Sequence, residues 1–346
     1  MIYLDDSNIG ELEKKSIMKT LNSGVVSTRG GGIYKFEEIM SEYLGVHSAL
    51  ATNSGTSALH LALLCCEISP LDEVILPALT FAASVNAVKY VGAKPVFVDI
   101  DPLTWNIDPA KVEKAINRRT KVIMPVHLYG NPCDMDTIME MARGYDLWVV
   151  EDACESLGAK WRKDHLGTIG HFGCFSFNGN KIMTTASGGL IISKIESIID
   201  RIRQIAQNRT HIEIGYNYRM NNIGAALGIA QFKRLGEFFS LKQIFNGIYR
   251  KELRDRVEFQ EEYSNGCSSC WFTNIFKENM DSLSIQSRLR LKKYNIPTRR
   301  IFAPMGPLQN CPNAERVYNH GLSLPSSTMN TKENIYQVCE KLKEIL

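Results

Sequence analysis

Between about residues 48 and 193, short runs that read as buried β-strands alternate with longer runs that have helical spacing. The expected strands are EVILP (73–77), KPVFVDI (94–100), KVIMPVHLYG (121–130), DLWVVEDA (146–153) and GCFSF (173–177). The helical runs between them are GTSALHLALLCCE (55–67), FAASVNAVKYVG (81–92) and MDTIMEMARGY (135–145). This alternation predicts an α/β fold with a mostly parallel central sheet and helices on both faces. Ligands of such sheets lie beyond the carboxyl ends of the strands, so chemistry is expected there.

The pattern changes beyond about residue 235. A helical stretch (242–256) is followed by a shorter strand candidate, WFTNIF (271–276), and the sequence closes with a helical stretch (331–346). We therefore predict a large domain over residues 1–235 and a smaller α+β domain over residues 236–346.

Charge and composition argue against several classes of partner. The net charge is +3 and the basic residues are spread throughout, so no nucleic-acid partner is expected. The first residues are acidic where a signal peptide would be basic, and no apolar run reaches the roughly 20 residues of a membrane span. We expect a cytoplasmic protein with reduced thiols. The spacing Cys267-Ser-Ser-Cys270 could be half of a zinc site or a redox pair, but no second pair lies near it, so no metal is predicted.

Three stretches in the first domain carry groups suited to one cofactor. In TNSGTSALHLAL (52–63), a turn with Gly55 and Thr56 opens a helix whose free N–H groups suit a phosphate, although Ser and Thr are also ordinary caps. Asp152 stands at the end of a buried strand, where it either caps a helix or pairs with a cation such as a protonated ring nitrogen. Lys181 lies in a polar turn after the next strand and is either a solvated charge or an imine-forming amine.

These groups match the three attachment points of pyridoxal phosphate (PLP). The cofactor needs a phosphate cradle, a carboxylate at its pyridinium nitrogen and an amine at its aldehyde. A fourth stretch, GYNYRMNNIGAALG (215–228), combines a turn containing Asn217 and Arg219 with small residues at helical spacing. Arg219 could equally stabilise that turn through an ion pair.

With these stretches in place, the sequence resembles the DegT/DnrJ/EryC1/StrS family of sugar aminotransferases, which have the aspartate-aminotransferase fold (PLP fold type I). The resemblance covers nearly the whole chain. It is carried by LNSGVVSTRGG, SGTSALHLAL, PALTFAASVNAV, VVEDACESLGA, FSFNGNKIMTT, YNYRMNNIGAALG and IPTRRIFAPMGPL. One departure follows the lysine, where the family often reads TTGEGG and this chain reads Thr184-Thr185-Ala186-Ser187-Gly188-Gly189.

The resemblance implies roles for individual residues in a PLP-binding large domain. Lys181 would carry the cofactor as a Schiff base, Asp152 would pair with its ring nitrogen, and Phe81 would stack on its ring face. The implied phosphate-binding positions are Gly55, Thr56 and Ser176, together with Asn217 from the partner subunit of a homodimer with shared active sites. Glu155 would lie near the 3-hydroxyl group. Arg299 and Arg300 are candidates either for a substrate diphosphate or for structural pairing.

The implied activity is transfer of an amino group, expected to come from glutamate, to a nucleotide-linked sugar by way of pyridoxamine phosphate. The acceptors that the resemblance suggests are 4-keto-6-deoxy sugars, such as the precursors of perosamine or bacillosamine, used for surface polysaccharides or glycans. Two alternatives stay open. The same cofactor could serve sugar deoxygenation or an amino-acid substrate, or the chain could be a regulatory homologue without catalysis.

Overall fold

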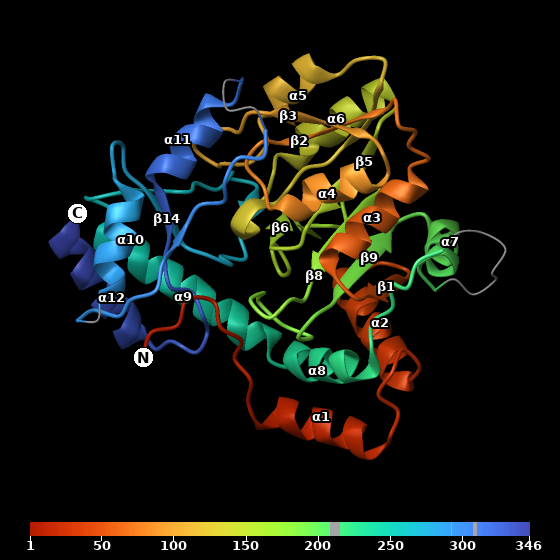
Figure 1. Ribbon diagram of the computed structural model, residues 1–346, viewed down its shortest axis with the longest axis horizontal. Coiled ribbons are helices and arrows are strands. Elements are labelled where there is room, and N and C mark those ends of the chain that lie inside the picture. The colour runs from red at the N-terminus through yellow and green to blue at the C-terminus, as the bar shows by residue number, and fades with distance from the viewer. Residues whose placement is uncertain (208–214, 292, 307–309) are drawn as a thin grey trace.

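The main sheet of the protein has seven strands and lies at the centre of the computed structural model (Figure 1), which describes residues 1–207, 215–291, 293–306 and 310–346. In spatial order these are β1 (Ala49–Thr52), β9 (Gly189–Ser193), β8 (Phe172–Ser176), β5 (Trp148–Asp152), β4 (Thr120–Ile123), β2 (Glu73–Pro77) and β3 (Lys94–Val98). Only β9 runs antiparallel to its neighbours. The mostly parallel sheet predicted from the sequence is confirmed.

Helices cover both faces of this sheet, as predicted. Side chains alternate along each strand, so Val74 and Leu76 of β2 join one buried cluster with α3 and α4, whereas Ile75 joins another with α6. A third cluster lies between the sheet and α2 and α8. The helices of this part are α1 (Glu11–Asn22), α2 (Gly31–Leu44), α3 (Gly55–Cys65), α4 (Ala82–Tyr90), α5 (Pro109–Ala115), α6 (Met135–Tyr145), α7 (Glu196–Gln207) and α8 (Asn222–Phe232), with a 3-10 turn at Leu128–Gly130.

The C-terminal part is a smaller α+β unit, also as predicted. The long helix α9 (Leu235–Leu253) leads into it from α8 (Figure 1). Its antiparallel sheet has the order β10 (Glu258–Phe259), β12 (Asn274–Phe276), β14 (Gly321–Ser323) and β13 (Arg299–Arg300). Its helices are α10 (Ser282–Arg290), α11 (Pro312–His320) and α12 (Lys332–Ile345). The exact domain boundary near residue 236 stays a prediction.

A small sheet and the first residues of the chain both contribute to the contact between the N-terminal and C-terminal parts. A small sheet combines the hairpin β6 (Lys160–Trp161) and β7 (Asp164–His165) with β11 (Gly266–Cys267). In addition, the segment 3–8 is held by the loop 326–330. The carbonyl of Leu4 accepts the N–H groups of Ser326 and Ser327, and Asn330 exchanges two hydrogen bonds with the main chain of Tyr3.

No helix within the described ranges is both long and apolar enough to cross a membrane.

The departure from the family pattern after Lys181 has a backbone consequence. Ala186 adopts a left-handed conformation with φ of 67°, and its side chain is exposed. A β-carbon in this conformation crowds the following carbonyl, which glycine avoids. The structure therefore indicates local strain at the position where the family often has glycine.

We expect Ala186→Gly to stabilise the fold by about 0.5–1 kcal/mol, because relief of this strain exceeds the added freedom of the unfolded chain. Urea unfolding at constant protein concentration measures the change. Ala110→Gly, at an exposed position in the first turn of α5, is the matched control and should destabilise. A destabilised Ala186→Gly protein would contradict the strain assignment.

Candidate active site

A cavity of about 240 Å³ lies beyond the carboxyl ends of β2, β5 and β8. All of the predicted site residues except Asn217 line it, namely Gly55, Thr56, Phe81, Asp152, Glu155, Ser176 and Lys181. These residues come from four separate stretches of sequence. The fold therefore brings them together at the edge of the sheet where the strand pattern placed the expected chemistry.

The first turn of α3 forms one wall of the cavity. Ser54 caps the helix, because its hydroxyl accepts the N–H of Ser57 at 3.1 Å. Gly55 follows at a point of close approach, where a β-carbon would lie 2.7 Å from the sulfur of Cys154 and 2.9 Å from the β-carbon of Ser176. The helix N-terminus, Thr56 and Ser176 thus face the same cavity with N–H and hydroxyl groups, which is an arrangement suited to an anion.

The two carboxylates at the end of β5 point to different surroundings. Asp152 lines the cavity, where its Oδ2 accepts the hydroxyl of Ser84 at 2.7 Å and its Oδ1 accepts the N–H of Cys154 at 3.1 Å. Glu151 is fully buried away from it, where it pairs with His127 at 3.0 Å and accepts three main-chain N–H groups between residues 167 and 170. Only Asp152 is therefore available to a ligand.

Lys181 lies in the polar turn after β8, and its side chain is largely buried. Its Nζ is 3.4 Å from Oε1 of Glu155 and 4.0 Å from the centre of the Trp271 ring. The indole N–H of Trp271 donates to the carbonyl of Asn180 at 2.7 Å, so the ring is fixed to the turn that carries the lysine. The amine is thus shielded from solvent, forms an ion pair with Glu155 and lines the cavity.

Glu155 is a buried carboxylate beside Lys181. Its Oε2 accepts the N–H of Tyr129 at 2.8 Å. Burial raises the pKa of Glu155 above its ordinary value of 4.5, while the Lys181 charge and the Tyr129 N–H oppose that rise. Glu155 therefore has the surroundings of a carboxyl group that can hold a proton.

Phe81 and Arg299 lie at the outer side of the cavity. The ring of Phe81 is 57% exposed and contacts the ring of Phe302, 5.6 Å between centres. Arg299 lines the cavity and donates to the carboxylate of Asp5 at 2.9 Å. The same Asp5 oxygen accepts the side-chain amide of Asn180 at 3.1 Å.

Arg300 has structural pairing instead. Its guanidinium donates to the hydroxyl of Tyr318 at 3.0 Å and lies 4.0 Å from the centre of that ring. Of the two arginines that the sequence left open, only Arg299 therefore reaches the cavity.

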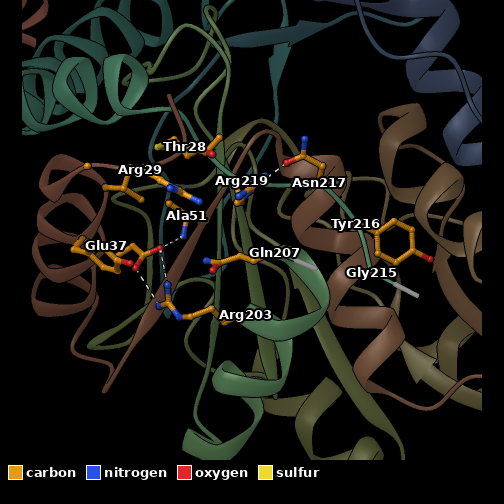
Figure 2. A pocket seen from close by; sticks show the side chains of 14 residues that line it. Thr28, Arg29, Glu37, Ala51, Arg203, Gln207, Gly215, Tyr216, Asn217 and Arg219 are labelled. Carbon is orange, nitrogen blue, oxygen red and sulfur yellow. Dashed lines mark hydrogen bonds and ion pairs between the residues drawn. The ribbon is translucent and has the colours of Figure 1, made fainter. Parts of the chain in front are cut away.

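Asn217 lies in a different pocket, of about 750 Å³ (Figure 2). Its side-chain oxygen accepts the Nε–H of Arg219 at 3.1 Å, so Arg219 is held by an amide rather than by the ion pair considered above. Arg29 and Thr28 line the same pocket, and Glu37 pairs there with Arg203 at 3.1 Å. Within one chain, Asn217 is not part of the cavity that holds Lys181.

Sequence reasoning missed several residues that shape the cavity. Ser84 lies one helical turn after Phe81, and this spacing could have suggested it as a partner for a group at the strand ends. Trp271 enters the sequence analysis only as the first residue of the strand candidate WFTNIF (271–276). Tyr129 lies at a turn with φ of 58°, and no sequence signal identifies its contact with Glu155.

The thiols of Cys267 and Cys270 are both free, the first exposed and the second buried. Among the described residues, no group of three or more histidine, cysteine or carboxylate side chains could hold a metal ion.

Comparison with known proteins identifies the family that this chain matches. Residues 7–343 match the model of the DegT/DnrJ/EryC1/StrS aminotransferase family. The GDP-perosamine synthase of Escherichia coli O157:H7 is 38% identical, over 96% of this chain and 95% of the relative. The UDP-N-acetyl-3-dehydro-alpha-D-glucosamine 3-aminotransferase of Acidithiobacillus ferrooxidans is 32% identical, over 87% of this chain and 85% of the relative.

Solved structures agree. Spr1654 from Streptococcus pneumoniae, described as a sugar aminotransferase in its PLP form, superimposes with a TM-score of 0.93. It is 26% identical to this chain, and the match covers 99% of this chain and 98% of that one.

The raised pKa of Glu155 gives a testable pH dependence. A carboxyl group with a raised pKa in the folded state disfavours folding once the pH exceeds its unfolded pKa, because the folded state resists ionisation. The stability of the wild-type protein relative to Glu155→Gln should therefore fall as the pH rises from about 4.5 through the raised pKa, and then level off. Urea unfolding across a pH series, with the exposed Glu42→Gln as control, measures this difference. A relative stability that rises over this range would contradict the assignment.

Proposed function

The chain belongs to the DegT/DnrJ/EryC1/StrS aminotransferase family, and we propose that it transfers an amino group from glutamate to a nucleotide-linked 4-keto-6-deoxy sugar. It is a PLP-dependent aminotransferase that acts on nucleotide-linked sugars. The observation that carries the proposal is that the amine of Lys181 and the carboxylate of Asp152 line one cavity together with the N-terminus of α3.

The cavity residues fit the cofactor. The first turn of α3, with Thr56 and Ser176, offers N–H and hydroxyl donors for the phosphate, and the absence of a side chain at Gly55 leaves the helix in contact with the sheet edge. Asp152, fixed by Ser84 and the Cys154 N–H, would hold a proton at the ring nitrogen. When bound, PLP supplies an electron sink for charge that develops at the substrate carbon.

The remaining residues would position the substrates and move protons. Lys181 would hold the aldehyde carbon of the cofactor and, once freed, its amine would carry the proton between substrate and cofactor carbons. Phe81, exposed at the mouth, would cover the ring face, and Glu155 would lie at the 3-hydroxyl edge. Arg299 is the one guanidinium that lines the cavity in the described part of the chain, so it would meet an anionic group of a substrate.

Two features support the 4-keto-6-deoxy acceptor and the shared-site homodimer. The GDP-perosamine synthase is the more similar of the two relatives described above, and perosamine precursors belong to this class of acceptor. The surface around α1 exposes a series of large apolar side chains, as an interface with a second copy would. These are Ile9, Leu12, Met18, Leu21, Val25, Val26 and Tyr34.

We expect the purified protein to be yellow and to lose its visible absorbance when glutamate is added, because the cofactor then takes the amino group. Lys181→Ala should not form the visible band that depends on the lysine. Keto-sugar nucleotides that differ in sugar and base are then added one at a time to the glutamate-treated protein. Only a nucleotide sugar that accepts the amino group should restore the visible band. A protein that absorbs in the visible but ignores glutamate would reject the donor and leave the cofactor assignment standing.

The role of Asn217 predicts complementation between two inactive variants. If Asn217 acts in the partner's site, a mixed dimer of Lys181→Ala and Asn217→Ala subunits has one site with both residues intact. Random mixing of the two proteins should then restore about a quarter of wild-type turnover. Turnover after co-refolding equal amounts, compared with each variant alone, measures this. No recovery, with mixed dimers verified by mass spectrometry, would place Asn217 in its own subunit's site, whereas full turnover of Asn217→Ala alone would place it outside both.

A further inference from the structure

Lys242 is a buried ammonium that the proposed chemistry does not use. It lies on α9, is only 5% exposed, and no carboxylate of the described chain forms an ion pair with it. Its Nζ instead donates to two main-chain carbonyls, that of Trp271 at 2.9 Å and that of Ser326 at 2.7 Å. Burial lowers the pKa of Lys242 to about 8, with smaller opposing effects from Cys270 and Asp5.

Such a group is costly to keep for stability alone. A buried charge loses its hydration, and an apolar side chain of similar length at the same position is often neutral or stabilising. What an apolar side chain cannot do is fix two carbonyl groups from distant segments at one point. The contacts of Lys242 therefore indicate that its role is to hold the Trp271 and Ser326 segments in place.

Both of these segments lead to the turn that carries Lys181. The Trp271 segment does so directly, because its indole N–H binds the Asn180 carbonyl and its ring lies against the Lys181 amine. The Ser326 segment does so through residues 4 and 5. The N–H of Ser326 binds the Leu4 carbonyl at 2.7 Å, and the carboxylate of Asp5 binds the side chain of Asn180. Asn180, the neighbour of Lys181, is thus held at its main chain and at its side chain.

Other contacts of α9 also hold the segment that contains Trp271. Gln243 donates to the Ser268 carbonyl at 2.6 Å, and Asn246 accepts the hydroxyl of Thr273 at 3.2 Å. The segment 268–273 is therefore attached to one face of the helix on both sides of the lysine contact. Lys242 is the member of this group that acts on Trp271 itself.

We propose that Lys242 is a positioning residue, which holds the Trp271 indole against Lys181 by fixing the Trp271 and Ser326 carbonyls from behind the cavity. The inference rests on the proposed function for the role of Lys181. The contacts themselves can be tested without the cofactor.

The first test is hydrogen exchange of the indole N–H groups in the cofactor-free protein, followed by NMR with labelled tryptophan. The four tryptophans give separate signals, and Trp271→Phe identifies the one of interest. In Lys242→Met, we expect the Trp271 indole to exchange about tenfold faster, because its hydrogen bond to Asn180 is no longer held in place. The signals of Trp105 and Trp161, buried elsewhere, should not change.

Two further variants keep this test decisive. Lys251→Met makes the same change at an exposed position on the same helix and should leave all four signals unchanged. Lys242→Gln retains a donor, so it should fold even if the methionine variant does not, and should show a smaller acceleration. Unchanged exchange at Trp271 in folded Lys242→Met or Lys242→Gln, or equal acceleration at every tryptophan, would overturn the proposal.

The second test asks whether Lys242 acts through Trp271. The dissociation constant of PLP is measured for Lys242→Met, for Trp271→Phe and for the double variant. If the lysine works through the indole, the loss of affinity in the double variant should be close to that of Trp271→Phe alone. If the fold losses of PLP affinity in the two single variants instead multiply in the double variant, the two residues act independently, and Lys242 does not act through Trp271. If even the wild-type protein fails to bind PLP, the proposed function fails, whereas the exchange test still decides the role of Lys242.

Discussion

The first turn of α3 lies directly against the ends of β5, β8 and β9, and the geometry of the cavity depends on this close approach. A β-carbon at Gly55 would collide with Cys154 and Ser176, and one at Gly189 would lie 2.4 Å from the main chain of Ser54. Glycine at both positions lets the positive end of the helix approach the edge where the parallel strands finish. The phosphate-type cradle, the carboxylate of Asp152 and the turn of Lys181 are therefore neighbours, although they lie far apart in the sequence.

Strand alternation then decides which of two adjacent acids can serve a ligand. Glu151 and Asp152 are neighbours in the sequence, but a strand sends them to opposite faces. Glu151 pairs with His127 and accepts three N–H groups of the loop after β7, and these contacts replace the hydration that its carboxylate loses on burial. Asp152 accepts the Ser84 hydroxyl and the Cys154 N–H, and it faces the cavity. One acid thus holds the loop and the other remains available for chemistry.

The sequence was sufficient for the parallel strands, for the helices α3, α4, α6, α9 and α12, and for the residues that follow the strands, because hydrophobic periodicity and chain direction are local properties. It was insufficient where a contact depends on distant segments. The contact of Trp271 with Lys181 joins residues 90 positions apart in the numbering, and only the packing of α9 against the loop 268–273 creates it. The strands β6 and β7 are two residues long, too short for a pattern to emerge. The roles of the individual cofactor-binding residues stay predictions, because they depend on contacts with PLP, and the fold shows only the protein side of those contacts.

The attachment of residues 3–8 to the loop 326–330 has a consequence for the order in which the protein is completed. The hydrogen-bond partners in that loop lie 320 to 327 positions further along the chain. During synthesis, the attachment of this segment to the loop must therefore wait until residues 326–330 have left the ribosome. Contacts with such large sequence separation form late, since the intervening chain must first be ordered. The central sheet can assemble from its own local units, but the attachment that fixes residues 3–8, which include the Asp5 partner of Asn180, is completed among the last steps of folding.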